Sequence, residues 1–281
     1  MDGKNRLTCM IFGRKIPCGN TNFHRGFCFM NTSDSNFFGT EKVSRILLKI
    51  APPVMLAQLI QALYNIVDSL FVGKYSESGL TALSIIYPLQ LLMIAIAVGT
   101  GVGINTAMAH YLGVHDEKKV NEYGGIGTPL TLVLWVLFAL ICFLFMPAYA
   151  RMSTDSPEVI KDVIVYGRIV CVFSIGLFTE SIWTKILQAN GDMRTPMIAQ
   201  IVGALVNIAL DPLLIFGMFG LPKLGIAGAA IATVVGQIVA ALIVMRKGFR
   251  KSPQLSVYPK GICFIYKLGI PNILMQSAYT F

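Results

Sequence analysis

The chain has 281 residues, of which 55% are hydrophobic and only 13% are charged, and its formal net charge is +9. Soluble domains carry about 25% charged residues, so this composition and the mean hydropathy of +0.67 exclude a soluble globular protein. They indicate an integral membrane protein. The basic residues lie mainly between apolar blocks, where they orient membrane helices, and we therefore expect no nucleic-acid partner.

Residues 1–40 form a polar, basic segment without a helical period. Cys9, Cys18, His24 and Cys28 are separated by eight, five and three residues, the spacing of a Cys3His zinc finger with the last Cys and His exchanged. The alternatives are a zinc knuckle and a disordered or extraneous tail, since Met30 offers a second start. We favour the tail, because the ligand order is exchanged and the rest of the chain is membrane-spanning.

The first predicted span is Ala51–Val72, with Pro52 and Pro53 in its first turn, where a helix tolerates proline. A polar stripe at steps of three or four residues follows one face of this helix, and it consists of Gln58, Gln61, Asn65 and Asp68. Such a stripe turns towards protein or a wet cavity. The glutamines fit interhelical hydrogen bonds, whereas an intramembrane acid such as Asp68 indicates function.

The next two predicted spans are Leu80–Leu112 and Gly124–Tyr149. Pro88 should bend the first of them, and the glycines at 99, 101 and 103 should allow close helix packing. A fourth span, Val163–Ala189, places Glu180 one turn before Thr184, and Lys185 lies near enough to the helix end to reach the interface. Glu180 is either a partner for a basic side chain or a functional acid.

The fifth predicted span contains the most concentrated polar group, in the segment Ala204–Phe216. Asn207 and Asp211 are four residues apart and share a helix face, and Pro212, which has no N–H, frees the carbonyl of Ile208. The sixth span, Leu224–Met245, carries Gly228, Ala232 and Gly236 as a small-residue ridge for a neighbouring helix, with Thr233 and Gln237 one turn apart on another line.

The loops predict the orientation of these six spans. With the N-terminus in the cytoplasm, basic residues are more frequent in the inner loops (Lys118, Lys119, Arg194, Arg246, Lys247, Arg250, Lys251 and Lys260) than in the outer loops (Lys74, Arg151, Lys161 and Lys223). We therefore expect a multi-pass protein of the cell (plasma or inner) membrane with a cytoplasmic N-terminus.

An internal repeat suggests a second lobe. The segment KIAPPVMLAQ (49–58) aligns without gaps to KLGIPNILMQ (267–276), so a second copy in the same orientation begins near the end of the chain. The predicted fold is an all-α polytopic membrane protein, with a polar tail at 1–40, a six-helix lobe at 41–250, and a cytoplasmic connector and truncated start of a second parallel-repeat lobe at 251–281. From this division we expect the chain to be an N-terminal fragment whose C-terminal lobe is missing.

From about Val43 onward the chain resembles the bacterial branch of the multidrug and toxic compound extrusion (MATE) transporters. The resemblance depends on five segments in the order typical of that family, namely LYNIVDSLFVG (63–73), LQANGDMRTPM (187–197), VNIALDPLLIFG (206–217), LGIAGAAIATVVGQ (224–237) and KLGIP (267–271). It implies two six-helix lobes around a cavity that opens alternately to each side of the bilayer, and export of small organic cations or amphiphiles against protons or sodium ions.

The resemblance also implies site residues. The N-lobe acids of the family fall on Asp68 and Asp211, its neighbouring amide on Asn207 and its sixth-helix hydroxyl on Thr233, and Ser181 and Thr184 stand in for polar side chains of the fourth helix. We expect Asp211 to couple ion entry to export, because its protonation would remove a charge and let the turn beside Pro212 repack. No cofactor is expected, and the coupling ion is H+ or Na+.

Two other functions remain open. A flippase for lipid-linked oligosaccharides should need more cationic side chains in its cavity, and only Arg168 and Lys185 lie within the spans. A non-transporting membrane receptor or scaffold would not require acids on two helices and a duplicated lobe. We expect no enzyme, since the three histidines have no nucleophile or metal-ligand set around them in the sequence.

Overall fold

The computed structural model describes residues 8–11, 14–17, 43–220, 222–254 and 258–278, and nearly all of them are helical. The elements are the strands β1 (Thr8–Ile11) and β2 (Arg14–Pro17), the helices α2 (Val43–Tyr75), α3 (Glu77–Gly113), α4 (Glu117–Ser153), α5 (Pro157–Val172), α6 (Ile175–Ala189), α7 (Arg194–Phe216), α8 (Ile226–Gly248) and α9 (Tyr258–Ala278), and the 3-10 turn η1 (Met218–Gly220). The two strands pair as an antiparallel hairpin. Of the predicted zinc ligands, Cys18, His24 and Cys28 lie outside the described residues.

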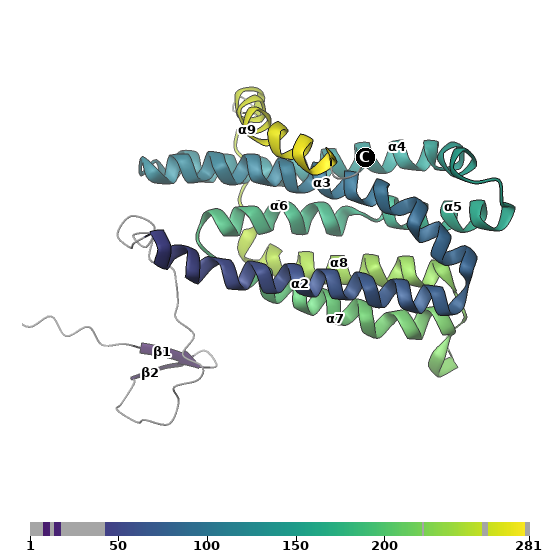
Figure 1. Cartoon of the computed structure of the whole chain (residues 1–281). Coiled ribbons are helices and arrows are strands. Elements are labelled where there is room, and N and C mark those ends of the chain that lie inside the picture. The colour runs from purple at the N-terminus through teal and green to yellow at the C-terminus, as the bar shows by residue number, and fades with distance from the viewer. Residues whose placement is uncertain (1–7, 12–13, 18–42, 221, 255–257, 279–281) are drawn as a thin grey trace, which may run out of the picture.

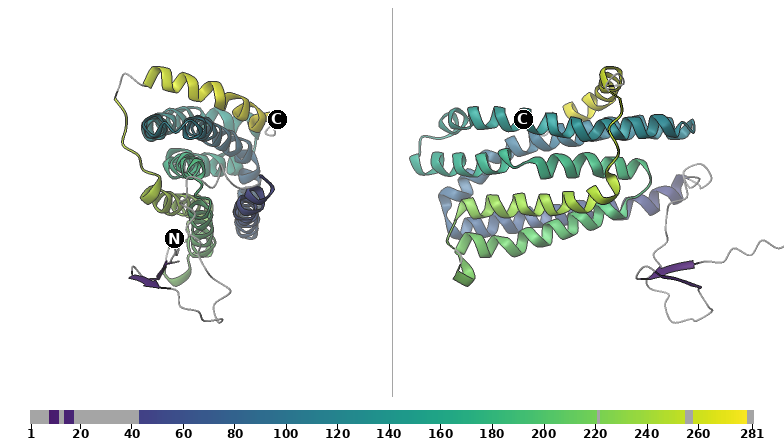
Figure 2. Two further views of the ribbon diagram at one scale, coloured as in Figure 1. Left: turned by 90° about the vertical axis from the view of Figure 1, so that its left-hand side faces the viewer. Right: turned by 180° about the vertical axis from the view of Figure 1, so that it is seen from behind.

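The predicted all-α membrane fold is confirmed. Five helices are long and apolar enough to cross a bilayer, and the bent pair α5 and α6 would make a sixth span, all within the residues that the structure describes. Figure 1 shows α3 and α4 in one layer, α5 and α6 in a second, and α7 and α8 in a third. The end view in Figure 2 shows α2 beside the third layer and α9 across the first.

The first helix begins earlier than predicted. Helix α2 starts at Val43, so Pro52 and Pro53 lie inside it and not in its first turn. The two prolines each remove one i to i−4 backbone hydrogen bond, but the helix continues through them. The basic run before Ala51 is therefore part of the same helix as the membrane-spanning segment.

The predicted fourth span is broken. Helices α5 and α6 meet at an angle of 44° across Phe173 and Ser174, where the backbone turns tightly and the Ser174 hydroxyl donates to the carbonyl of Cys171 at 2.7 Å. Just beyond the break, Gly176 lies against the α8 backbone, and a Cβ on it would come within 2.8 Å of the Ile238 nitrogen. The break lets the start of α6 approach α8 closely.

Glycines set the separation of α7 and α8. A Cβ on Gly203 would lie 2.8 Å from the carbonyl oxygen of Gly236, and one on Gly236 would lie 2.7 Å from that of Gly203. The ridge predicted on α8 therefore packs as expected. The helix α7 ends at Phe216, because Gly217 adopts a left-handed conformation with φ of 71°.

Glycines on α3 hold two further helices. Gly99 and Gly103 face α9, where their added Cβ atoms would collide with Ile273 and with the carbonyl of Ile265. Gly101, two residues from each, faces α6 and leaves room for the side chain of Lys185. These contacts fix α6 beside α3, and α6 forms one wall of the site described next.

Candidate functional site

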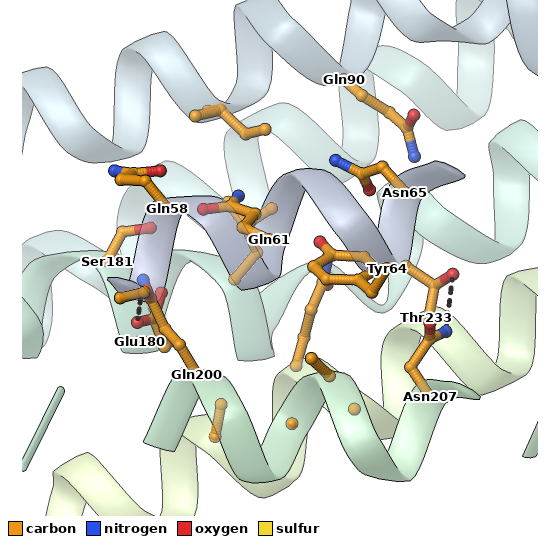
Figure 3. A pocket seen from close by; sticks show the side chains of 18 of the residues that line it. Gln58, Gln61, Tyr64, Asn65, Gln90, Glu180, Ser181, Gln200, Asn207 and Thr233 are labelled. Atoms are coloured by element: carbon orange, nitrogen blue, oxygen red, sulfur yellow. Dashed lines mark hydrogen bonds between the residues drawn. The ribbon is translucent and has the colours of Figure 1, made fainter. Parts of the chain in front are cut away.

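A cavity of about 660 Å³ opens inside the bundle, lined by polar and apolar residues of α2, α3, α5, α6, α7 and α8 and by Gln276 of α9. The stripe predicted along α2 faces it, since Gln58, Gln61, Asn65 and Asp68 are all lining residues. Figure 3 shows Gln58, Gln61 and Asn65 of this stripe around the cavity, together with residues of α3, α6, α7 and α8. The polar residues around the cavity form two clusters.

The first polar cluster, which we call the aspartate cluster, consists of Asp68, Asn207, Asp211 and Thr233. All four side chains are buried, and Asp211 is completely inaccessible. The Asn207 amide nitrogen lies 3.5 Å from Asp211 Oδ1 and 3.5 Å from Thr233 Oγ1, which are long hydrogen bonds. Asn207 therefore connects the acid of α7 to the hydroxyl of α8, as Figure 3 shows for the Thr233 contact.

The aspartate cluster has spare oxygen atoms. Asp68 Oδ1, Asn207 Oδ1 and Asp211 Oδ2 are buried and have no hydrogen-bond partner among the described residues. Carboxylate and amide oxygens are the ligands that hard cations prefer, and a carboxylate oxygen can also take up a proton. The cluster can therefore hold a sodium ion or a proton. Asp68 lines the cavity and so connects the cluster to the cavity.

A tyrosine that the sequence analysis missed belongs beside this cluster. The buried Tyr166 of α5 interacts with Thr233 and Asp68, and its hydroxyl is 3.5 Å from Gln90 Nε2 of α3. It therefore joins α3 and α8 at the wall of the cavity. A lone tyrosine in an apolar segment gives no periodic signal from which this position could be predicted.

The second polar cluster at the cavity, which we call the glutamate cluster, consists of Glu180, Ser181, Thr184 and Gln200. Glu180 Oε1 accepts hydrogen bonds from Thr184 Oγ1 at 2.9 Å and from Gln200 Nε2 at 3.3 Å, and all four residues line the cavity. The predicted pairing of Glu180 with Thr184 is confirmed. Ser181 and Thr184 therefore lie with Glu180, and no hydrogen bond among the described residues connects them to Asp211.

Tyr64 lies between the two clusters. Figure 3 shows it between Glu180 on one side and Asn207 and Thr233 on the other, and it interacts electrostatically with both Asp68 and Glu180. Its position one turn before Asp68 on α2 could have marked it in the sequence. Among the described residues, no group of three His, Cys, Asp or Glu side chains could hold a metal ion.

Comparisons with known proteins relate this chain to a family of membrane transporters. The family model MatE matches residues 53–213, more than half of the chain. A probable multidrug resistance protein of Bacillus subtilis, YoeA, is 32% identical over 80% of this chain and 52% of its own length. An FAD transporter of Shewanella oneidensis is 27% identical over 70% of this chain and 44% of its own.

The fold is also found in solved structures. An outward-facing multidrug resistance MATE family transporter of the MOP superfamily superposes with a TM-score of 0.75 and 24% identity, over 83% of this chain and 52% of that one. The chain thus spans about half the length of the relatives that it matches.

Proposed function

The chain belongs to the MatE family, and from this premise we propose that it forms one lobe of a secondary active transporter that exports organic cations or other amphiphiles in exchange for protons or sodium ions. The chain is a multi-pass membrane protein whose relatives are named as transporters. In our proposal residues 41–250 form the lobe, the N-terminus faces the cytoplasm of the cell membrane, and a second lobe completes the cavity.

The aspartate cluster supports this proposal most directly. It places two acids from different helices, Asp68 and Asp211, in electrostatic contact, buried and with spare oxygens. An acid in the membrane interior is energetically costly, and its presence there therefore indicates a function. We propose that an ion binding to Asp211, with Asn207 and Asp68 in support, repacks the turn that Pro212 weakens and so releases substrate from the cavity.

The two acids of the aspartate cluster differ in their access to the cavity. Asp68 lines the cavity, whereas Asp211 is buried behind the lining and is reached through Asn207. Of the two acids, an ion that arrives from the cavity therefore meets Asp68 first. Substrate in the cavity and an ion at Asp211 would then compete through α7, which carries both Asp211 and the cavity-lining Gln200, and such coupling is the requirement for exchange of one for the other.

A flippase for lipid-linked oligosaccharides ranks second. Such a cargo carries a pyrophosphate, and a cavity that holds it needs several cationic side chains. Lys185 is the only basic residue lining the described cavity, because the Arg168 guanidinium lies over the Phe143 ring instead, at 4.8 Å from its centroid. A membrane scaffold that transports nothing would not account for the buried acids.

The test is export of a fluorescent organic cation by the complete two-lobe transporter in a drug-sensitive host. Proton and sodium gradients are imposed separately, with Asp211→Asn as the variant and Glu158→Gln, which changes an exposed acid, as the control. We expect one gradient to drive export in the wild type and the control, and Asp211→Asn to abolish it. Export that survives in Asp211→Asn would contradict the assignment of the coupling residue, and no export of any cation would favour the flippase.

A further inference from the structure

One end of the helix bundle carries an excess of basic residues. Lys185, which the sequence analysis expected to reach the membrane interface, instead lines the cavity, so other basic side chains form that interface. They outnumber acids where α3 connects to α4, α6 to α7 and α8 to α9, whereas basic residues and acids are balanced in the connections at the opposite end. Such an excess orients membrane helices, but orientation does not require the basic residues to be held in one place.

The connector that follows α8 is fixed against the start of α4. A Cβ on Gly125 of α4 would collide with the carbonyl of Lys251, and one on Gly124 would lie 3.4 Å from Cγ of Arg250. Figure 2 shows this connector leaving α8 along one edge of the bundle. Lys118 lies two turns before Gly125 on the same face of α4. The two glycines therefore place the basic residues of the connector on the helix that carries Lys118.

Three aromatic rings lie at the same end of the bundle. The rings of Tyr111 of α3 and Tyr123 of α4 are stacked with their centroids 5.1 Å apart, and the Phe264 ring of α9 is 5.8 Å from that of Tyr123. The Lys119 ammonium lies 4.8 Å from the centroid of the Tyr111 ring. Tyrosine rings are typical of the headgroup level of a bilayer. We call Tyr111, Lys118, Tyr123, Arg250, Lys251 and Phe264 the interface patch.

The basic members of the interface patch are available to an anion. Lys118 and Lys251 are exposed and Arg250 is half-buried. The ion pairs found among the described residues involve the amino groups of Lys119 and Lys247 instead. Arginine and lysine are the side chains that bind phosphate oxygens, arginine through two parallel donors.

Helix α4 continues from the patch as an apolar surface. Leu132, Val133 and Val136 are 46%, 60% and 54% exposed, and Val136 lies five turns beyond Lys118 on the same face of the helix. A ligand with a phosphate at one end and hydrocarbon chains at the other therefore matches both parts of this surface, whereas a soluble phosphate matches the first part alone.

We propose that the interface patch binds the headgroup of an anionic phospholipid such as phosphatidylglycerol or cardiolipin. Lys118, Arg250 and Lys251 contact the lipid phosphate, the tyrosine rings lie at the headgroup level, and the acyl chains pack along α4. Basic pockets between membrane helices bind such headgroups, and in the proposed orientation this end of the lobe faces the cytoplasmic leaflet. The lipid is a bound partner of the protein and not a substrate of its cavity.

The test measures lipid binding to the purified, complete two-lobe transporter in neutral detergent by native mass spectrometry. Phosphatidylglycerol is compared with phosphatidylcholine of the same acyl chains, and we expect the wild type to prefer phosphatidylglycerol. Arg250→Gln combined with Lys251→Gln should weaken binding of phosphatidylglycerol about 25-fold, or about five-fold for each basic residue, and spare phosphatidylcholine. Lys161→Gln combined with Lys223→Gln removes the same charge from exposed residues at the opposite end and is the control that should change neither.

A second variant keeps every charge. Gly125→Ala pushes the carbonyl of Lys251 away from α4, so it should weaken binding of phosphatidylglycerol although the net charge is unchanged. Gly113→Ala, whose added Cβ meets nothing within 4 Å, should bind the lipid as the wild type does.

Three results would overturn the proposal. Equal binding of the two lipids to the wild type would show that the patch does not select an anionic headgroup. Equal losses in the connector variant and its control, or no loss in Gly125→Ala, would show that only net charge matters. Displacement of the lipid by glycerol phosphate at the same concentration would show that the patch takes a soluble phosphate. Lipid binding is measured without export, so each result leaves the proposed transport function untouched.

Discussion

The two polar clusters of the cavity use similar side chains in different surroundings. In the aspartate cluster the acids are buried, Asp211 does not line the cavity, and the partners are a single amide and hydroxyl at 3.5 Å. In the glutamate cluster the acid lines the cavity, its hydrogen bonds are shorter, and a lysine shares the same wall. The fully buried, loosely bonded acid Asp211 suits a small ion, and the partly buried, more firmly bonded Glu180 at the cavity wall suits one end of a larger molecule.

The helices that carry the clusters explain the difference. The aspartate cluster joins α2, α7 and α8, where α7 and α8 pack backbone to backbone through Gly203 and Gly236. The glutamate cluster lies on α6, which α3 supports, with only Gln200 from α7. A movement of α7 against α6 would therefore alter the aspartate cluster and Gln200 together. We take this arrangement as the physical basis for coupling between the sites.

The largest effect should come from separating α7 and α8. Gly236→Ala places a Cβ 2.7 Å from the Gly203 carbonyl and 3.2 Å from Asn207 Cβ, which should lower the free energy of unfolding by about 2 kcal/mol, or roughly 5 °C in melting temperature. Gradient-driven export should fall more than binding of the fluorescent cation. Gly113→Ala, where an added Cβ meets nothing within 4 Å, is the control in a thermal melt, and equal stability of the two variants would refute the packing argument.

Removal of the amide should affect only the aspartate cluster. Asn207→Ala deletes the donor to both Asp211 and Thr233, and a lost buried hydrogen bond costs about 1–3 kcal/mol. The ion concentration that gives half-maximal export should therefore change about ten-fold or more. The affinity for a cationic dye at saturating or absent ion should stay the same, and a change in that affinity of equal size would show that the clusters are not separate.

Removal of a hydroxyl should affect only the glutamate cluster. Thr184→Val keeps the shape of the side chain but deletes the donor to Glu180 Oε1, so binding of the cationic dye should change about five-fold, the equivalent of about 1 kcal/mol. Ion dependence should be unaffected. A shifted ion dependence in Thr184→Val would place Glu180 in the coupling pathway.

The smallest effect concerns the loop before α7. Burial raises the pKa of Asp192, but hydrogen bonds from Thr195 and the charge of Lys247 outweigh it and hold the pKa below its usual range. A lowered pKa in the folded protein gives stability above the unfolded pKa of about 3.9 that is lost as the pH falls through the folded value. Lys247 is 64% exposed, so the contribution is no more than about 1 kcal/mol.

The corresponding variant is Asp192→Asn, which keeps a side-chain oxygen for the start of α7. Between pH 5 and 3 the melting temperature of the wild type should fall further than that of Asp192→Asn, and above pH 5 the difference between them should not depend on pH. A parallel loss in both proteins would show that Asp192 is not the group responsible.

Sequence patterns were sufficient to predict the membrane class, the helical spans and the helix faces of the polar residues. The stripe on α2 and the pair Asn207 and Asp211 follow from the helical period alone, and the structure places both at or beside the cavity. The break between α5 and α6 could not be predicted from the sequence. Neither Phe173 nor Ser174 is a proline, and the two residues leave the apolar pattern and the helix propensity of the segment uninterrupted.

The grouping of polar residues into two clusters could be predicted only in part. The helical period pairs Thr184 with Glu180, but the packing of α6 against α3 and α8 decides that Ser181 and Thr184 do not reach Asp211. The same applies to Lys185, whose direction depends on a glycine more than 80 residues earlier in the chain. Contacts between helices carry this information, and the helical period within one segment does not.

The most direct test of the division between ion coupling and ligand binding is the equilibrium affinity of the complete transporter for a cationic fluorescent dye, measured over a series of pH values and sodium concentrations. We predict that Asp211→Asn keeps the affinity but loses its dependence on the ion, and that Glu180→Gln weakens the affinity about ten-fold but keeps that dependence. If both variants lose affinity and ion dependence to the same extent, the two clusters act as one site and the division is wrong.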